Sequence, residues 1–233
     1  MSFITPRDAD YLRAKRIKQG QSHTDPVYDT FIERFQLEYG VKPLTVFAGA
    51  MARTRGQPKT PRLSVVLERS DERRRFLTAP YLADKRKQKA VARLLTDSLQ
   101  PRDLQAIFGL AGVSADEIYV YFADFEDVAK QEVHDLATAS TELDRFVASL
   151  GIGDQFWCTQ RLSGPPIVFV RTREQATAIK ASDRPVTWAD TYFEIAKRHD
   201  EFGYLTRSEI AILVDSKENF DNNYSSNWFY YFK

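Results

Sequence analysis

Apolar positions in the first forty residues recur with the spacing of amphipathic helices, in two separate segments. Thr5 followed by Pro6 is typical of a helix start, and Gly20 is typical of a helix end. The second segment repeats this arrangement, with Pro26 in its first turn and Gly40 at its end. Because the connection between the segments is short, the pattern predicts an N-terminal helical hairpin.

The pattern then changes to the shorter periods that are typical of strands. Residues 44–53 and 62–69 are separated by a basic turn that is rich in Gly and Pro, which predicts a β-hairpin. Residues 117–125 form the clearest strand, because β-branched and aromatic residues dominate them. A second hairpin is expected from residues 156–162 and 167–171, around a Gly-Pro-Pro turn.

Helices are expected over residues 84–99, 102–113, 126–138, 142–150, 172–181 and 187–199. The chain then continues with an apolar segment, residues 209–215, and ends with five consecutive aromatics, residues 228–232. We interpret these two segments as strands of a closing hairpin, since aromatic strands commonly fill cores. The alternative is a platform on which unpaired bases stack.

Together these elements predict an α+β fold, in which helices cover a mostly antiparallel sheet and the N-terminal helical hairpin packs onto it. No low-complexity linker divides the chain, so we expect a single domain over residues 1–233. An alternative division gives two lobes, residues 1–110 and 111–233. Residues 119–131 and 167–179 both read as strand, polar joint and helix, without a residue-level repeat.

Charge separates the two halves of the chain more clearly than hydrophobicity does. Residues 1–100 contain 20 Lys and Arg against 11 Asp and Glu, and the remaining 133 residues contain 13 against 21. The longest apolar runs are of strand length, so we expect no membrane span. The N-terminus lacks the apolar region of a secretory signal, and Cys158 is the single cysteine. These features favour a cytoplasmic protein.

Within 37 residues of the basic half we single out eleven cations, and we refer to them as the basic belt. Its members are Arg53, Arg55, Lys59, Arg62, Arg73, Arg74, Arg75, Lys85, Arg86, Lys87 and Lys89. Cations that converge in space bind phosphate oxygens, so the belt predicts a nucleic-acid or acidic-protein partner. The alternative is a solvated face that is paired with neighbouring acids.

The most concrete enzymatic alternative is a metal-dependent nuclease. Asp215 and Lys217 follow an apolar strand, which resembles sites where two acids hold Mg²⁺ and a lysine orients water. The second acid would be Asp190, Glu194 or Glu209. The acidic segment of residues 116–154 has a sufficient structural reason in helix starts, which favour carboxylates.

His23, His134 and His199 lack a second ligand at zinc-site spacing, and Cys158 is typical of a small buried side chain. We therefore expect no metal and no cofactor. The leading prediction is a non-enzymatic binding protein of intracellular bacterial type, which uses its basic N-terminal face. A third possibility is a self-associating homo-oligomer, in which the basic half of one copy meets the acidic half of another.

Overall fold

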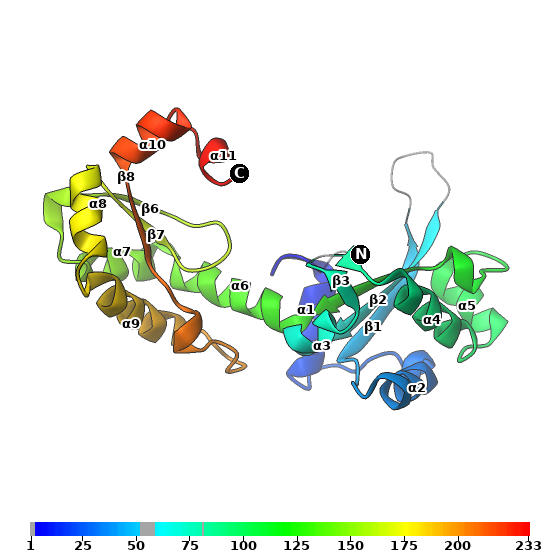
Figure 1. Cartoon of the computed structure of the whole chain (residues 1–233). Helices are drawn as coiled ribbons and strands as arrows, with labels where there is room; N and C mark the ends of the chain where they lie inside the picture. The colour runs from blue at the N-terminus through cyan, green and yellow to red at the C-terminus, as the bar shows by residue number, and fades with distance from the viewer. Residues whose placement is uncertain (1–2, 52–58, 81) are drawn as a thin grey trace. The chain divides into compact units, whose positions relative to one another are not determined.

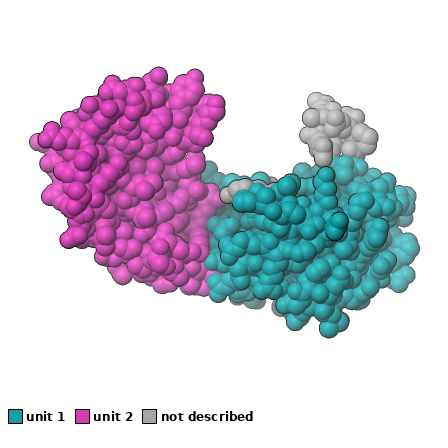
Figure 2. Space-filling view, in the orientation of Figure 1, with its two compact units in different colours: residues 1–128 teal, residues 129–233 magenta. Residues whose placement is uncertain are grey.

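The computed structural model of the chain describes residues 3–51, 59–80 and 82–233. It confirms the α+β class, since helices alternate with strands that form three small sheets (Figure 1). The chain separates into two compact units, residues 1–128 and 129–233 (Figure 2). The division lies inside helix α6 (Phe125–Ala137), whereas the sequence suggested a boundary between lobes near residue 110.

The first unit is built around a three-stranded sheet. Its elements are α1 (Ala9–Lys18), η1 (Pro26–Tyr28), α2 (Asp29–Tyr39), β1 (Thr45–Met51), β2 (Thr60–Leu67), α3 (Ser70–Arg74), β3 (Leu77–Ala79), β4 (Leu82–Ala83), α4 (Lys85–Thr96), α5 (Pro101–Phe108), η2 (Ala115–Glu117) and β5 (Tyr119–Asp124). The predicted hairpin is confirmed, because β1 pairs antiparallel with β2. β5 pairs parallel with β2, so this sheet is mixed, although antiparallel pairs predominate among the described strands. The helices between β2 and β5 return the chain to the end where β2 began.

The two N-terminal helices are confirmed, but the structure does not show them packed together as a hairpin. α1 packs against β1, whereas α2 packs against α4. Gly40 ends α2 with φ 67°, a left-handed conformation that glycine adopts without strain. The stop signal in the sequence was therefore correct, although the packing partner of each helix is distant in the chain.

The sheet of the first unit has two different faces, because successive strand residues point to opposite sides. Leu63, Val65 and Phe122 lie on one face and form a core with α2, α4 and α5. The other face carries Phe47, Arg62, Ser64, Tyr119 and Tyr121, and we call it the tyrosine face. α1 packs against this sheet at β1, and at the far end Tyr119 is 47% exposed.

The second unit repeats this plan with shorter strands. It contains most of α6, then α7 (Ser140–Ser149), η3 (Gly153–Gln155), β6 (Phe156–Gln160), β7 (Ile167–Val170), α8 (Arg173–Lys180), α9 (Arg184–Lys197), η4 (Arg207–Glu209), β8 (Leu213–Ser216), α10 (Lys217–Tyr224) and α11 (Trp228–Tyr231). β6 and β7 form the predicted second hairpin, and β8 pairs parallel with β7. Val168, Val170 and Val214 face a core that includes Trp188 and Tyr192.

The prediction that residues 228–232 form a strand is wrong, because they form α11 and its end. Asn227 caps this helix by accepting a hydrogen bond from Phe229 N at 2.9 Å. Trp228 then stacks on Phe220 with 4.0 Å between ring centroids, and it also contacts the buried ring of Phe169. The aromatic tail therefore covers a sheet face as a helix and does not extend the sheet.

Each unit has the same hydrogen bonds at the joint where its two parallel strands end and the following helices begin. In the first unit, Glu126 N donates to Glu68 O at 3.1 Å, and in the second, Glu218 N donates to Arg171 O at 3.2 Å. The side chains match as well, since Glu126 accepts from Ser70 N at 3.2 Å and Glu218 accepts from Arg173 N at 3.0 Å. The order hairpin, helices, parallel strand, helix thus occurs twice in the chain.

This correspondence changes the repeat that the sequence suggested. β2 is equivalent to β7, and β5 is equivalent to β8, because these strands make the matching bonds. Residues 119–131 and 167–179, which look alike in sequence, belong to β5 with α6 and to β7 with α8. The two segments are therefore not equivalent, because β5 is the strand that pairs parallel with the hairpin of its unit, whereas β7 is the second strand of a hairpin.

Candidate nucleic-acid interface

The basic belt is divided between two parts of the first unit. Lys59 and Arg62 belong to the start of β2, whereas Arg73, Arg74 and Arg75 follow its end. Lys85, Arg86, Lys87 and Lys89 lie on α4, which packs against the core face of the sheet. Arg53 and Arg55 lie outside the described residues.

Arg73 is held within the protein. Its Nη1 donates to Asp124 Oδ2 at 2.7 Å and to Asp127 Oδ2 at 3.4 Å. Asp124 is fully buried at its side chain, and its Oδ1 also accepts from Ser70 Oγ at 3.0 Å and from Asp127 N at 2.7 Å. Burial raises the pKa of the Asp124 carboxyl, while the Arg73 hydrogen bond opposes that effect. This cation stabilises the joint of α3, β5 and α6.

Two of the cations on α4, Lys87 and Lys89, also have partners within the protein. Lys87 donates to the carbonyl oxygen of Arg75, and its ammonium lies 5.6 Å from the ring centroid of Phe76. Lys89 forms an exposed ion pair with Asp116 at 3.7 Å. Asp84 caps the helix by accepting from Arg86 N at 2.8 Å, so an acid offsets the cations of the first turn.

Arg62 differs from these cations because it lies among aromatic rings on the tyrosine face. Its guanidinium carbon stands 5.0 Å from the ring centroid of Tyr121. The register places Arg62 beside Tyr119. Among the described residues, Arg62 Nε is buried without a hydrogen-bond partner. The pKa of Tyr121 is raised by burial and held down by Arg73 and Arg62, so the hydroxyl stays neutral next to the guanidinium.

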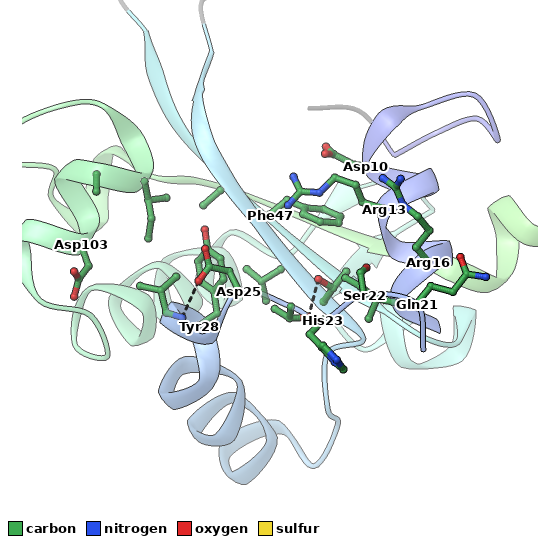
Figure 3. A pocket seen from close by; sticks show the side chains of 18 residues that line it. Asp10, Arg13, Arg16, Gln21, Ser22, His23, Asp25, Tyr28, Phe47 and Asp103 are labelled. Atoms are coloured by element: carbon green, nitrogen blue, oxygen red, sulfur yellow. Dashed lines mark hydrogen bonds between the residues drawn. The ribbon is translucent and has the colours of Figure 1, made fainter. Parts of the chain in front are cut away.

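A second aromatic–arginine pair lies where α1 crosses the same face. Arg13 of α1 is exposed and lies over Phe47 of β1, 4.8 Å from the ring centroid (Figure 3). Phe47, Ser64 and Tyr121 are register partners across the three strands, so they form one row on the sheet. Two arginine–aromatic stacks therefore occupy one surface, together with the exposed ring of Tyr119.

Sequence reasoning found Arg62 and missed Arg13, Tyr119 and Tyr121. The signal for the tyrosines is their alternation in the strand, which puts both on one face. The pairing of β5 with β2 decides which face of the sheet the tyrosines occupy, and that pairing joins residues 57 apart in the chain. Arg13 reaches the site through the packing of α1.

The residues of the nuclease hypothesis make other contacts. Asp215 Oδ2 accepts from Tyr231 Oη at 2.8 Å and from Asn219 Nδ2 at 3.0 Å. Lys217 pairs with Asp221 and lies over the Trp157 ring at 5.4 Å. Within residues 3–51, 59–80 and 82–233, no group of three or more His, Cys, Asp or Glu side chains is arranged to hold a metal ion.

Two of the three candidate second acids, Asp190 and Glu209, also have partners of their own. Asp190 Oδ1 accepts from Arg207 Nε at 2.5 Å, and Glu209 Oε1 accepts from Lys130 Nζ at 2.6 Å.

His134 is buried, its Nδ1 lies 2.9 Å from Tyr192 Oη, and burial lowers its pKa to about 4. Burial raises the pKa of the Cys158 thiol to about 11. These values describe groups that remain neutral inside the protein.

In the described part of the chain, no helix is both long and apolar enough to cross a bilayer. No protein-family model, curated protein or solved structure matches the chain. The interpretation of the site therefore depends on its own geometry.

Proposed function

We propose that the chain binds single-stranded nucleic acid on the tyrosine face of its first unit. The observation that carries the proposal is the row of two arginine–aromatic stacks beside an exposed tyrosine, Tyr119. Base stacking on aromatic side chains and arginine planes is typical of proteins that bind unpaired strands. The guanidinium groups of Arg13 and Arg62 supply the positive charge that phosphates need.

An acidic protein surface was the other predicted partner, and the geometry favours nucleic acid over it. A protein partner would be attracted by the cations alone. On this face, however, the cations lie against the planes of aromatic rings. Proteins that bind single strands use such combinations of arginine and aromatic side chains to stack bases. The exposed ring of Tyr119 on the same face also offers a plane on which a base stacks.

The test is fluorescence anisotropy of a labelled single-stranded oligonucleotide at several NaCl concentrations. We expect the association constant to fall with salt with a log–log slope of about −2, which corresponds to about three phosphate contacts. Arg62→Gln lowers the slope by about 0.7, whereas Arg86→Gln on α4 leaves it unchanged. Tyr119→Ala weakens binding about tenfold, since stacking contributes roughly 1–3 kcal/mol per base.

Tyr230→Ala is the matched control for Tyr119→Ala, because Tyr230 is also an exposed tyrosine (54%) but belongs to α11 in the second unit. Equal losses for both tyrosine variants, or binding that is indifferent to salt, contradict the proposal. Retention of binding by Arg62→Gln with an unchanged slope also contradicts it.

A further inference from the structure

A cavity of about 770 Å³ adjoins the tyrosine face, between α1, the residues that follow it and β1 (Figure 3). This volume falls within the range of about 300–1,000 Å³ that is usual for small-molecule sites. Figure 3 shows Asp10, Arg13 and Arg16 on α1, with Arg13 reaching over Phe47. His23, from the connection after α1, is exposed on another part of the wall.

Asp10 is the unusual member of this wall. It is only 7% exposed, and among the described residues its Oδ2 has no hydrogen-bond partner. Leaving a buried acceptor without a donor costs about 1–3 kcal/mol, and more when the acceptor is charged. Burial raises the pKa of Asp10, and the charges of the N-terminal amine, then of Arg13 and Arg62, oppose that rise. Oδ2 therefore lacks a donor, and an N–H group of a molecule that enters this part of the cavity would supply one.

Asp10 also connects the cavity to the tyrosine face. The positive charges of Arg13, which covers Phe47, and of Arg62, which covers Tyr121, both lower the pKa of the Asp10 carboxyl. Phe47 and Tyr121 are separated by one strand in their row, so their backbones are about 10 Å apart. A strand bound over Tyr121 can therefore place its next base over Arg13, with the edge of that base toward Asp10.

We propose that Asp10 reads one base of the bound strand, and that this base is guanine. Of the four bases, guanine presents two adjacent N–H donors, N1–H and the 2-amino group, on its Watson–Crick edge, and a carboxylate accepts from both. The outer side of the Arg13 guanidinium supplies a plane on which the base stacks. Arg16 carries the positive charge for the neighbouring phosphate. This inference rests on the proposed function of the tyrosine face.

The experiment compares three labelled nine-nucleotide single strands with the full chain at fixed salt. All positions are thymidine except the central one, which is guanosine, inosine or thymidine. Inosine lacks the 2-amino group and is otherwise guanine. The wild-type protein is expected to bind the guanosine strand about tenfold more tightly than the inosine and thymidine strands, as one specific base contact commonly provides.

Asp10→Asn replaces the carboxylate by an amide of the same shape, and it removes a buried charge, so the fold is retained. In this variant the preference for guanosine is expected to disappear, while binding of the thymidine strand remains. Asp103→Asn is the matched control, because Asp103 is a carboxylate on α5 that lines the same cavity. The control is expected to keep the preference.

The outcomes separate this inference from the proposed function. Salt-sensitive binding of all three strands with equal affinity overturns the reading of guanine and leaves the tyrosine face as a binding surface. A guanosine preference that survives Asp10→Asn also overturns it. Failure to bind any of the strands refutes the proposed function itself.

Discussion

Replacing Arg73 by methionine should destabilise the first unit by about 3 kcal/mol. The change keeps a long side chain but removes the donor that lies 2.7 Å from Asp124 Oδ2. Asp124 is fully buried at its side chain, so it is left with an uncompensated charge. Breaking a buried ion pair costs about 3–5 kcal/mol, and the lower value applies because Oδ1 keeps its bonds from Ser70 and Asp127.

The second unit suggests how this loss can be relieved. At the position equivalent to Asp124 it carries Ser216, whose hydroxyl caps α10 by accepting from Asn219 N at 3.0 Å. Asp124→Ser should therefore still cap α6 and should no longer need a cation. When Asp124→Ser is combined with Arg73→Met, the free energy of unfolding lost by the double variant should be about 2 kcal/mol smaller than the sum of the losses in the two single variants. The exposed contact of Arg73 with Asp127 adds little to this coupling.

The assay is urea unfolding followed by circular dichroism at 222 nm, for the wild type, the two single variants and the double variant. Amide hydrogen exchange over residues 119–133 shows whether the loss is located at the joint. If the two single losses add to within about 0.5 kcal/mol in the double variant, the ion pair does not carry the stability that we assign to it.

Two further outcomes follow from buried side chains of the second unit. The folded pKa of His134 lies near 4, below the unfolded value of about 6.5, so its contribution to stability is complete above pH 6.5 and is lost as pH falls toward 4. The difference in unfolding free energy between wild type and His134→Gln should therefore shrink by about 3 kcal/mol over that range, and a constant difference would show that the residue does not titrate in this way. Trp228→Ala, which removes the stack on Phe220, should cost about 2 kcal/mol by thermal unfolding, whereas the 70% exposed Phe229→Ala should cost under about 0.5, and equal effects would contradict the packing of α11.

Local signals in the sequence were sufficient for most helices and for both hairpins. The helix predicted over residues 172–181 is an example, because Thr172 at its start caps α8 by accepting from Gln175 N at 3.3 Å. The parallel pairs were not predictable in this way. β2 and β5 are joined through three helices, and nothing within either segment specifies the direction of its partner.

The aromatic tail shows how tertiary contacts override local propensity. Residues 228–232 have the composition of a strand, in which Trp228, Tyr230 and Phe232 would share one side. As a helix, the chain instead directs Trp228 and Tyr231 together onto the Phe169 ring and leaves Tyr230 exposed. Their spacing of three fits a helix, and the Asn227 cap supports its start.

Comparison of the two units gives an independent reason to place binding on the tyrosine face. Their joints keep the same hydrogen bonds, so these bonds satisfy what the shared fold requires. Ser64 in β2 is equivalent to Ile167 in β7. Two residues before them, the first unit has Arg62 and the second unit has Pro165. The position of Tyr121 is likewise occupied by Leu213.

The strands of the second unit therefore build an equivalent sheet without a cation or a tyrosine at these two positions, and the tail of that unit covers the end near Phe169. Arginine and tyrosine in the first unit are thus not demanded by the architecture. The proposed ligand contact gives these side chains a role that the shared fold does not require of them. The proposed recognition site therefore belongs to the first unit, and the described strands of the second unit carry no equivalent row of side chains.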